Sequence, residues 1–215
     1  MATTANRKLD NQVKPVGENA NDHAPSRVAS PRDEVLPRPH LWTKKQYHKM
    51  AKMGWFEGQR VELIEGEIIE MTAMNTPHWT AILLADEALR RAFGEGYLIA
   101  VQLPFDAGDN SEPEPDVAVI KGAPRDFAGG LPKSPLLVVE VSDTTLAFDR
   151  TRKAAMYARA GIEEYCIVNL KKRQLEVHRA PSDNGYADIK IVKSKELVSP
   201  VAAPQASVKV ADLLP

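Results

Sequence analysis

The 215-residue chain has a single cysteine, and aromatic residues make up only 6% of it. One cysteine cannot form an intramolecular disulfide, so a reducing compartment is expected. We interpret Cys166, inside the apolar run EYCIVN, as a small buried residue rather than a nucleophile. No apolar run approaches the roughly 18 residues that span a bilayer, and the N-terminal segment lacks the apolar centre of a signal peptide. The sequence therefore predicts a cytoplasmic protein without membrane contact.

A surplus of either charge is also missing. Lys and Arg number 28 and Asp and Glu number 29, so the net charge is -1, and bulk charge does not favour a nucleic acid partner. The five histidines have no zinc-ligand spacing, and neither a phosphate-binding glycine loop nor a serine nucleophile elbow is present. Basic residues do gather around Arg150–Arg159 and at 171–173, where a phosphate-facing surface and ordinary solvated charges are both possible.

The composition changes along the chain. Residues 1–38 are rich in Asn, Asp, Pro, Ala and Arg and have no hydrophobic period, so we expect a flexible tail. Residues 39–215 are predicted to form one domain. It begins with a short helix that Thr43 caps and Gly54 ends, followed by a hairpin with its turn at Glu65-Gly66.

A longer helix and a series of strands follow. The helix is predicted to have Thr76 as its N-cap, Pro77 at its first position and Gly94 as its stop, with an apolar face made of Trp79, Ile82, Leu83, Leu89 and Phe93. Strands are predicted in YLIAVQLPF, PDVAVI and LLVVEVS, then a helix in AFDRTRKAAMYARAG, then strands in EEYCIVN, QLEVHRA and YADIKIVKS. This order is typical of a mixed α/β or α+β domain built on one sheet.

Two acids occupy unexpected places in these strands. Glu140 lies inside the apolar run LLVVEVS, where a carboxylate without a partner is costly, and Asp116 opens the strand PDVAVI. If the two strands pair, both carboxylates face one point, which suits Mg²⁺ or Mn²⁺ because hard cations prefer oxygen ligands. Lys153, early in the following helix, is expected to reach the end of the Glu140 strand and to orient a water or stabilise charge there.

Structural interpretations of the same residues stay open at this stage. Asp116 can cap a turn, Glu140 can form an ion pair with Lys153 or Arg150, and Lys153 can be an ordinary solvated residue. The sequence alone does not choose between these interpretations and a metal site.

Four ordered segments together resemble one protein family. The segments VELIEGEIIEMTAMNTPHWTAIL, EPDVAVI, LLVVEVSD and DRTRKAAMYARAGIEEYCIVN are similar to the Uma-two family, a bacterial group of uncharacterised proteins grouped with restriction endonucleases. The resemblance covers residues 40–213. It implies a restriction endonuclease-like α+β fold of the PD-(D/E)XK superfamily, with a central mixed sheet flanked by helices and with an N-terminal hairpin and helix.

The resemblance also implies roles for individual residues. Asp116 matches the acid of the PD motif and Glu140 the acid of the (D/E)XK motif, while Ser142 stands where that motif has its lysine. Lys153 matches a lysine that has moved to the following helix. The implied activity is Mg²⁺-dependent (or Mn²⁺-dependent) hydrolysis of phosphodiester bonds, with DNA as substrate and a homodimer as the assembly. A nuclease-fold module without activity, acting in protein or nucleic-acid interaction, is the alternative.

Three further residues match family positions or neighbour them. Glu62 is a candidate third metal ligand, or else a solvent-facing strand residue. His78, in the first turn of its helix, is expected either to contact a phosphate or to support the hairpin. Tyr157 lies one helical turn after Lys153, and we interpret it as a packing residue.

Overall fold

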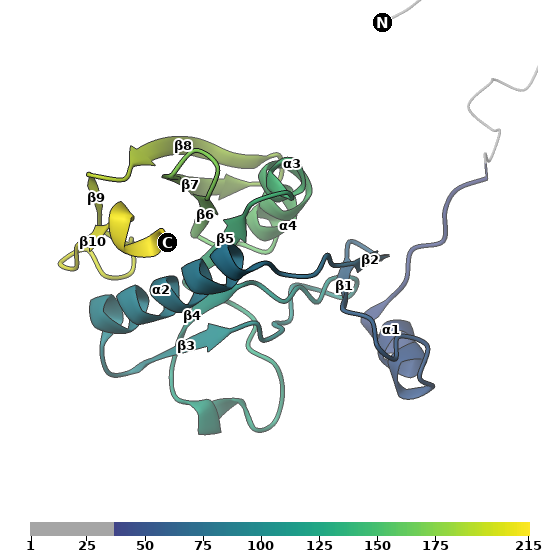
Figure 1. Ribbon diagram of the computed structural model, residues 1–215. Coiled ribbons are helices and arrows are strands. Elements are labelled where there is room, and N and C mark those ends of the chain that lie inside the picture. The colour runs from purple at the N-terminus through teal and green to yellow at the C-terminus, as the bar shows by residue number, and fades with distance from the viewer. Residues whose placement is uncertain (1–36) are drawn as a thin grey trace, which may run out of the picture. The chain divides into compact units, whose positions relative to one another are not determined.

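A six-stranded mixed sheet is the centre of the computed structural model, which describes residues 37–215 (Figure 1). β5 and β6 run parallel, and every other pair of neighbours is antiparallel. The predicted α+β fold is therefore confirmed. In sheet order the strands are β3 (Tyr97–Val101), β4 (Val117–Lys121), β5 (Leu137–Ser142), β6 (Glu164–Asn169), β7 (Gln174–Ser182) and β8 (Gly185–Lys193).

The sheet belongs to a unit that runs from Pro39 to Pro215. The flexible tail predicted for residues 1–38 lies almost entirely outside the described residues. Within residues 37–215, no helix combines the length and the apolar character that a membrane crossing needs.

One face of the sheet packs against α2 (Thr76–Phe93) and against a C-terminal segment of β9 (Leu197–Val198), β10 (Val208–Lys209) and the 3-10 turn η4 (Val210–Leu213). The buried positions that alternate along the central strands supply this core. They are Val117, Val119, Leu137, Val139, Val141, Cys166, Val168, Leu175 and Val177.

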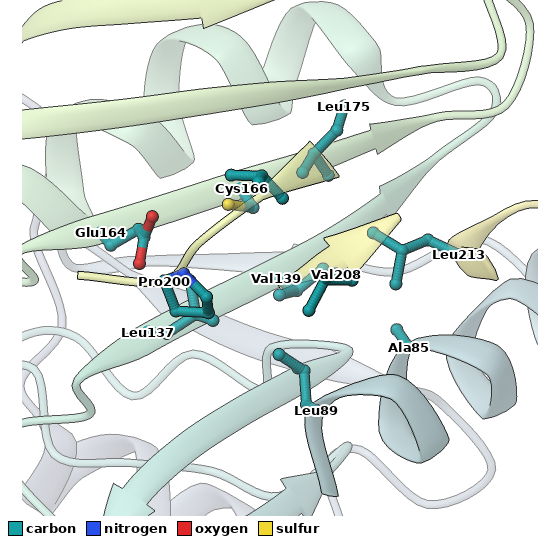
Figure 2. A pocket seen from close by; sticks show the side chains of 11 residues that line it. Ala85, Leu89, Leu137, Val139, Glu164, Cys166, Leu175, Pro200, Val208 and Leu213 are labelled. Carbon is teal, nitrogen blue, oxygen red and sulfur yellow. The ribbon is translucent and has the colours of Figure 1, made fainter. Parts of the chain in front are cut away.

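The core on this face contains a cavity of about 30 Å³ (Figure 2). Apolar side chains such as Leu89, Val139 and Leu213 line most of it, and Cys166 lies on its sheet side. Burial raises the pKa of the Cys166 thiol well above its ordinary value, so the thiolate that a nucleophile requires is disfavoured. The interpretation of Cys166 as a buried structural residue is confirmed.

Two details of α2 differ from the prediction. Asn75, not Thr76, is the N-cap, because its side chain accepts a hydrogen bond of 3.0 Å from the His78 amide. Ile82, Leu89 and Phe93 are buried as expected, but Trp79 is 55% exposed and Leu83 is exposed as well. These two residues lie on a neighbouring stripe of the helix, which the described elements leave partly uncovered.

The other face of the sheet packs against the connection between β5 and β6. This connection comprises α3 (Leu146–Phe148), the π-helical turn η3 (Asp149–Lys153) and α4 (Ala154–Arg159). Val138 on this face packs in the second core. Since alternate residues of a strand share a face, Glu140 and Ser142 point to the same side as Val138. The helix predicted after β5 is thus present, but a π turn interrupts it.

The N-terminal elements are the helix α1 (Lys44–Lys52) and a hairpin of β1 (Val61–Ile64) and β2 (Glu67–Glu70). Thr43 caps α1 as predicted, in a reciprocal pair of hydrogen bonds with Gln46. A further 3-10 turn, η2 (Pro124–Phe127), follows β4.

The hairpin turn has the predicted residues, and both have positive φ, 51° at Glu65 and 82° at Gly66. A Cβ at Gly66 would lie 2.6 Å from the Leu41 Cβ, so the turn requires glycine. The loop before β4 holds the hairpin, since the Gly66 amide donates to the Asn110 carbonyl and the Glu112 amide to the Leu63 carbonyl. These contacts fix β1 beside the sheet.

Candidate active site

Asp116, directly before β4, lies next to Glu140 on the paired strand β5. Val117 pairs with Val139 in an antiparallel register, so extending the register by one residue brings Asp116 opposite Glu140. Asp116 Oδ2 accepts a hydrogen bond of 2.8 Å from the Val141 amide, which fixes its carboxylate beside Glu140. Both residues are buried. The predicted proximity of the two acids is present in the structure.

Lys153 reaches the same point from the π turn. Its side chain is only 1% exposed, and its Nζ donates a hydrogen bond of 2.8 Å to Glu140 Oε1. A π turn inserts one extra residue into a helix and changes the direction of the side chains that follow, and such turns are frequent at functional sites. The interpretation of Lys153 as a solvated residue is therefore wrong.

Glu62 joins this cluster from the hairpin. Its side chain is buried, and its Oε2 lies 3.3 Å from Lys153 Nζ. In the described part of the chain this oxygen accepts no hydrogen bond. The alternative of a solvent-facing residue is wrong for Glu62, and β1 carries its carboxylate to the pocket that holds Asp116 and Glu140.

The environment perturbs the protonation of the whole cluster. Burial raises the pKa of Glu140 to about 8; the Lys153 ammonium offsets part of this rise, and Asp116 adds to it. Burial also raises the pKa of Glu62, again against the effect of Lys153. For Lys153, burial opposes the charge, but Glu140 and Glu62 outweigh it and raise the pKa of the ammonium. The cluster thus holds one cation among several crowded acids, an arrangement that is enriched at functional sites.

Two more side chains position these acids. His78 Nε2 lies 3.3 Å from Asp116 Oδ2, so the first turn of α2 supports the carboxylate directly. Tyr157 donates a hydrogen bond of 2.6 Å from its hydroxyl to Glu140 Oε1. Tyr157 is fully buried and packs against Phe105 and Tyr165, as its interpretation as a packing residue requires. The bond to Glu140 is a second role that the sequence did not reveal.

The pocket above these groups has a volume of about 40 Å³, and Arg60 and Glu114 are part of its lining. Sequence reasoning missed both residues. Each stands two positions before a predicted site residue, Arg60 before Glu62 and Glu114 before Asp116, and this spacing in extended chain gives side chains on one side. Arg60 is exposed, and the ion pairs formed within residues 37–215 do not include its guanidinium.

The arginines of the β5–β6 connection are engaged in ion pairs, although their side chains remain partly exposed. Arg150 donates two hydrogen bonds of 2.7 Å to Glu176, Arg152 pairs with Glu67, and Arg159 pairs with Glu65. The proposed ion pair between Arg150 and Glu140 is absent, because Arg150 binds Glu176 instead. These pairs attach the β5–β6 connection to the hairpin and to β7.

The fit of this cluster to a metal ion depends on Lys153 as well as on the acids. Among residues 37–215, no three His, Cys, Asp or Glu side chains converge as a formed metal site would require. The position of Lys153 explains this, since its ammonium already binds Glu140 and lies beside Glu62. The donor set nevertheless fits a hard cation, because the acids offer carboxylate oxygens and Glu62 Oε2 accepts no hydrogen bond.

The mixed sheet, with one acid directly before β4, one acid within β5 and a lysine from the following helical connection, has the arrangement of the restriction endonuclease-like fold class. The sequence model of the Uma2 (Uma-two) family, described as "Putative restriction endonuclease", matches residues 45–211. The match covers most of the chain, and the protein belongs to this family. No curated protein matches the chain.

A solved structure supports the fold. It is the crystal structure of "a putative nuclease belonging to DUF820" from Anabaena variabilis, which superimposes with a TM-score of 0.59 at 17% sequence identity. The match covers 72% of this chain and 89% of the other. At this identity the likeness concerns the fold alone.

Proposed function

We propose that this protein is a metal-dependent endonuclease that hydrolyses phosphodiester bonds, with DNA as its substrate. The observation that carries the proposal is the cluster in which Lys153 Nζ lies 2.8 Å from Glu140 and 3.3 Å from Glu62. Asp116 lies opposite Glu140, which is on the adjacent strand β5. Buried acids of this kind destabilise the fold unless a cation compensates their charge. Binding of a metal cation would explain why several acids are buried together here.

Asp116 and Glu140 would hold the Mg²⁺ or Mn²⁺, and Glu62 would add a third carboxylate. When bound, the ion supplies a Lewis acid that stabilises charge on the phosphate and lowers the pKa of a bound water. His78 and Tyr157 keep the Asp116 and Glu140 carboxylates in place through the contacts described above. The ligand set is therefore oriented by neighbours that do not themselves need to bind the ion.

Lys153 would supply a fixed positive charge at the reacting phosphate. Its raised pKa keeps the ammonium protonated near neutral pH, so it donates hydrogen bonds rather than accepting a proton. A charged donor held in a buried site stabilises developing negative charge without reorganising during the reaction. In this role Lys153 replaces the motif lysine, whose position in the sequence is occupied by Ser142.

Arg60 would bind a phosphate at the mouth of the pocket. The guanidinium is exposed, lines the same pocket as Glu62 and Lys153, and forms no ion pair in residues 37–215. A guanidinium binds phosphate oxygens in a bidentate manner. The substrate backbone would thereby be held on the rim, while the acids below remain available to the cation.

A cytoplasmic location and a homodimer are further parts of the proposal. The first rests on the single cysteine, which is typical of proteins from a reducing compartment. The second rests on β8 at the end of the sheet, which supplies no residue to the lining of the pocket.

Calorimetry with Mn²⁺ tests the proposed site directly. The intact protein is expected to bind the ion, Asp116→Asn to lose the binding, and Asp143→Asn, the matched control directly after β5, to retain it. An absence of binding to all three proteins, combined with no cleavage of plasmid DNA, would instead favour the inactive interaction module. The Lys153–Glu140 pair is the observation that favours that alternative, since a lysine can permanently take the place of the cation.

A further inference from the structure

The last strand of the sheet, β8, has a free edge. It pairs with β7 on one side, and within residues 37–215 no strand lies beyond it in the sheet order. Its residues 187–191 are all exposed, including Ile189 at 56% and Ile191 at 41%. A nine-residue edge strand with two exposed isoleucines and no proline is a template for pairing with another chain.

Two charged residues of β8, Asp188 and Lys190, lie on the face opposite to the isoleucines. Asp188 and Lys190 line a groove of about 180 Å³ between β7, β8 and β9. Within residues 37–215 neither side chain has an ion-pair partner, whereas their neighbour Arg179 on β7 is bound to Glu164. Asp188 and Lys190, two positions apart on the same face, are thus available for ion pairs with another chain.

We propose that β8 pairs with β8 of a second copy of this chain, antiparallel, about a twofold axis at Ile189. In this register Ile189 faces Ile189 of the second copy. Asp188 of each copy faces Lys190 of the other, so two opposite-charge pairs form. Ala187 faces Ile191 of the second copy on the side of the isoleucines. Directly opposed opposite charges and apolar pairs each stabilise an antiparallel ladder, while like charges destabilise it.

The charges select this register among those that a twofold axis allows. An axis at Asp188 places two carboxylates opposite each other, and an axis at Lys190 places two ammonium groups opposite each other. An axis at Ile191 sets Lys190 against Val192 and forms no opposite-charge pair. The axis at Ile189 is the one that matches both the charges and the isoleucines, so a second copy complements this edge better than an unrelated strand.

This dimer does not depend on nuclease activity, although it has a consequence for the proposed site. The sheet of each copy would continue into the other, and both candidate pockets would face the same side. From β5 of one copy to β5 of the other there are seven spacings between strands, or about 34 Å across the sheet at about 4.8 Å each.

Cysteine cross-linking tests the register. Opposed residues in an antiparallel ladder have Cα atoms about 4.5–5.5 Å apart, within the range for a disulfide. The Ile189→Cys variant is expected to form a covalent dimer on mild oxidation. The Ile191→Cys variant, whose two copies lie about 13 Å apart along the strands, is expected to remain uncoupled, but to couple when mixed with Ala187→Cys. The intact protein is the control, because its cysteine is buried.

Charge exchange tests the pairing without new cysteines. In sedimentation equilibrium the intact protein is expected to dimerise, and Asp188→Lys and Lys190→Asp are each expected to weaken dimerisation about tenfold. Combining both changes restores the opposite charges and is expected to restore the dimer. Lys209→Asp, at an exposed position of β10, is the matched control. A monomer at all concentrations, cross-linking through Ile191→Cys alone, or failure of the double exchange to restore the dimer would overturn the proposal, whether or not the protein cleaves DNA.

Discussion

Lys153 and Glu140 form a buried hydrogen-bonded ion pair, with 2.8 Å between Nζ and Oε1, although 13 residues separate them in the chain. The pair connects the π turn η3 to the middle of the sheet, and Tyr157 donates to the same carboxylate oxygen. The carboxylate that seemed misplaced in an apolar strand is therefore part of a group of polar side chains. The stability and the proposed chemistry of the protein both depend on this group.

Removing the ammonium is expected to destabilise the protein strongly. In Lys153→Met the acids Glu140 and Glu62 remain buried without a cation, and losing one partner of a buried pair costs about 3–5 kcal/mol. Chemical denaturation at neutral pH, followed by circular dichroism, measures this loss. Lys171→Met, at an exposed turn, is the control and is expected to change stability by less than about 0.5 kcal/mol. A loss below about 1 kcal/mol in Lys153→Met would show that the pair contributes little.

Acid is expected to weaken the contact between the β5–β6 connection and β7. Burial works against the charge of Glu176, but hydrogen bonds from Arg150, Asn169 and Gln174 outweigh it and hold the pKa of Glu176 below its ordinary value. A lowered carboxyl pKa stabilises the fold above the unfolded-state pKa of about 4.3. This stability is lost as the pH falls through the folded-state value.

Glu176→Gln should therefore be less stable than the intact protein by about 2 kcal/mol at pH 7. The difference should shrink below about pH 4, where the intact protein loses the same charge. Denaturation curves from pH 3 to 7 measure this trend. Glu87→Gln, in an exposed pair with Arg91, is the control and should show no comparable pH dependence. A difference that stays constant with pH would contradict the assignment to Glu176.

The hairpin turn that carries Glu62 to the pocket is expected to tolerate no side chain at Gly66. Gly66→Ala combines a positive φ of 82° with a contact of 2.6 Å to Leu41 Cβ, and should cost at least about 1–3 kcal/mol. Gly129→Ala is the control, since nothing lies within 4 Å of its added Cβ and its φ is not in the left-handed region. Thermal denaturation of both variants makes the comparison. Equal thermal unfolding midpoints for the two variants would mean that the turn rearranges without loss of stability.

Arg60 is expected to contribute to substrate binding more than to the chemical step. Arg60→Gln removes the exposed guanidinium from the pocket rim and should raise KM for a DNA duplex about tenfold, because one phosphate contact is lost, while kcat changes less. Steady-state cleavage rates separate the two parameters. Arg125→Gln, in the turn η2 outside the pocket lining, is the control. A lower kcat with KM unchanged would place Arg60 in the reaction itself.

Much of the site could be predicted from local patterns. Asp116 and Glu140 converge because two successive apolar strands pair and because alternate residues share a face, and both rules act over a few residues. The hairpin turn at Glu65-Gly66 and the cap at Thr43 were predictable for the same reason. Glycine accommodates the positive φ of the turn, and the Thr43 side chain accepts a backbone hydrogen bond at the start of α1.

What could not be predicted depends on long-range packing. The depth of Lys153 follows from a π turn, and the sequence carries no periodic signal for one extra residue. β9 and β10 each have only two residues, too few for a strand pattern. The exposure of Trp79 reflects which parts of α2 the C-terminal segment covers, and helical spacing alone does not contain that information.

Cleavage of supercoiled plasmid DNA in the presence of Mg²⁺ tests the central claim most directly. The intact protein is expected to convert the plasmid to nicked and linear forms, EDTA is expected to stop the reaction, and Asp116→Asn is expected to reduce the rate at least about 100-fold. Circular dichroism of Asp116→Asn verifies that the variant is folded. A folded Asp116→Asn that cleaves as fast as the intact protein, or an intact protein that leaves the plasmid uncut with Mg²⁺ and with Mn²⁺, would contradict the proposed activity.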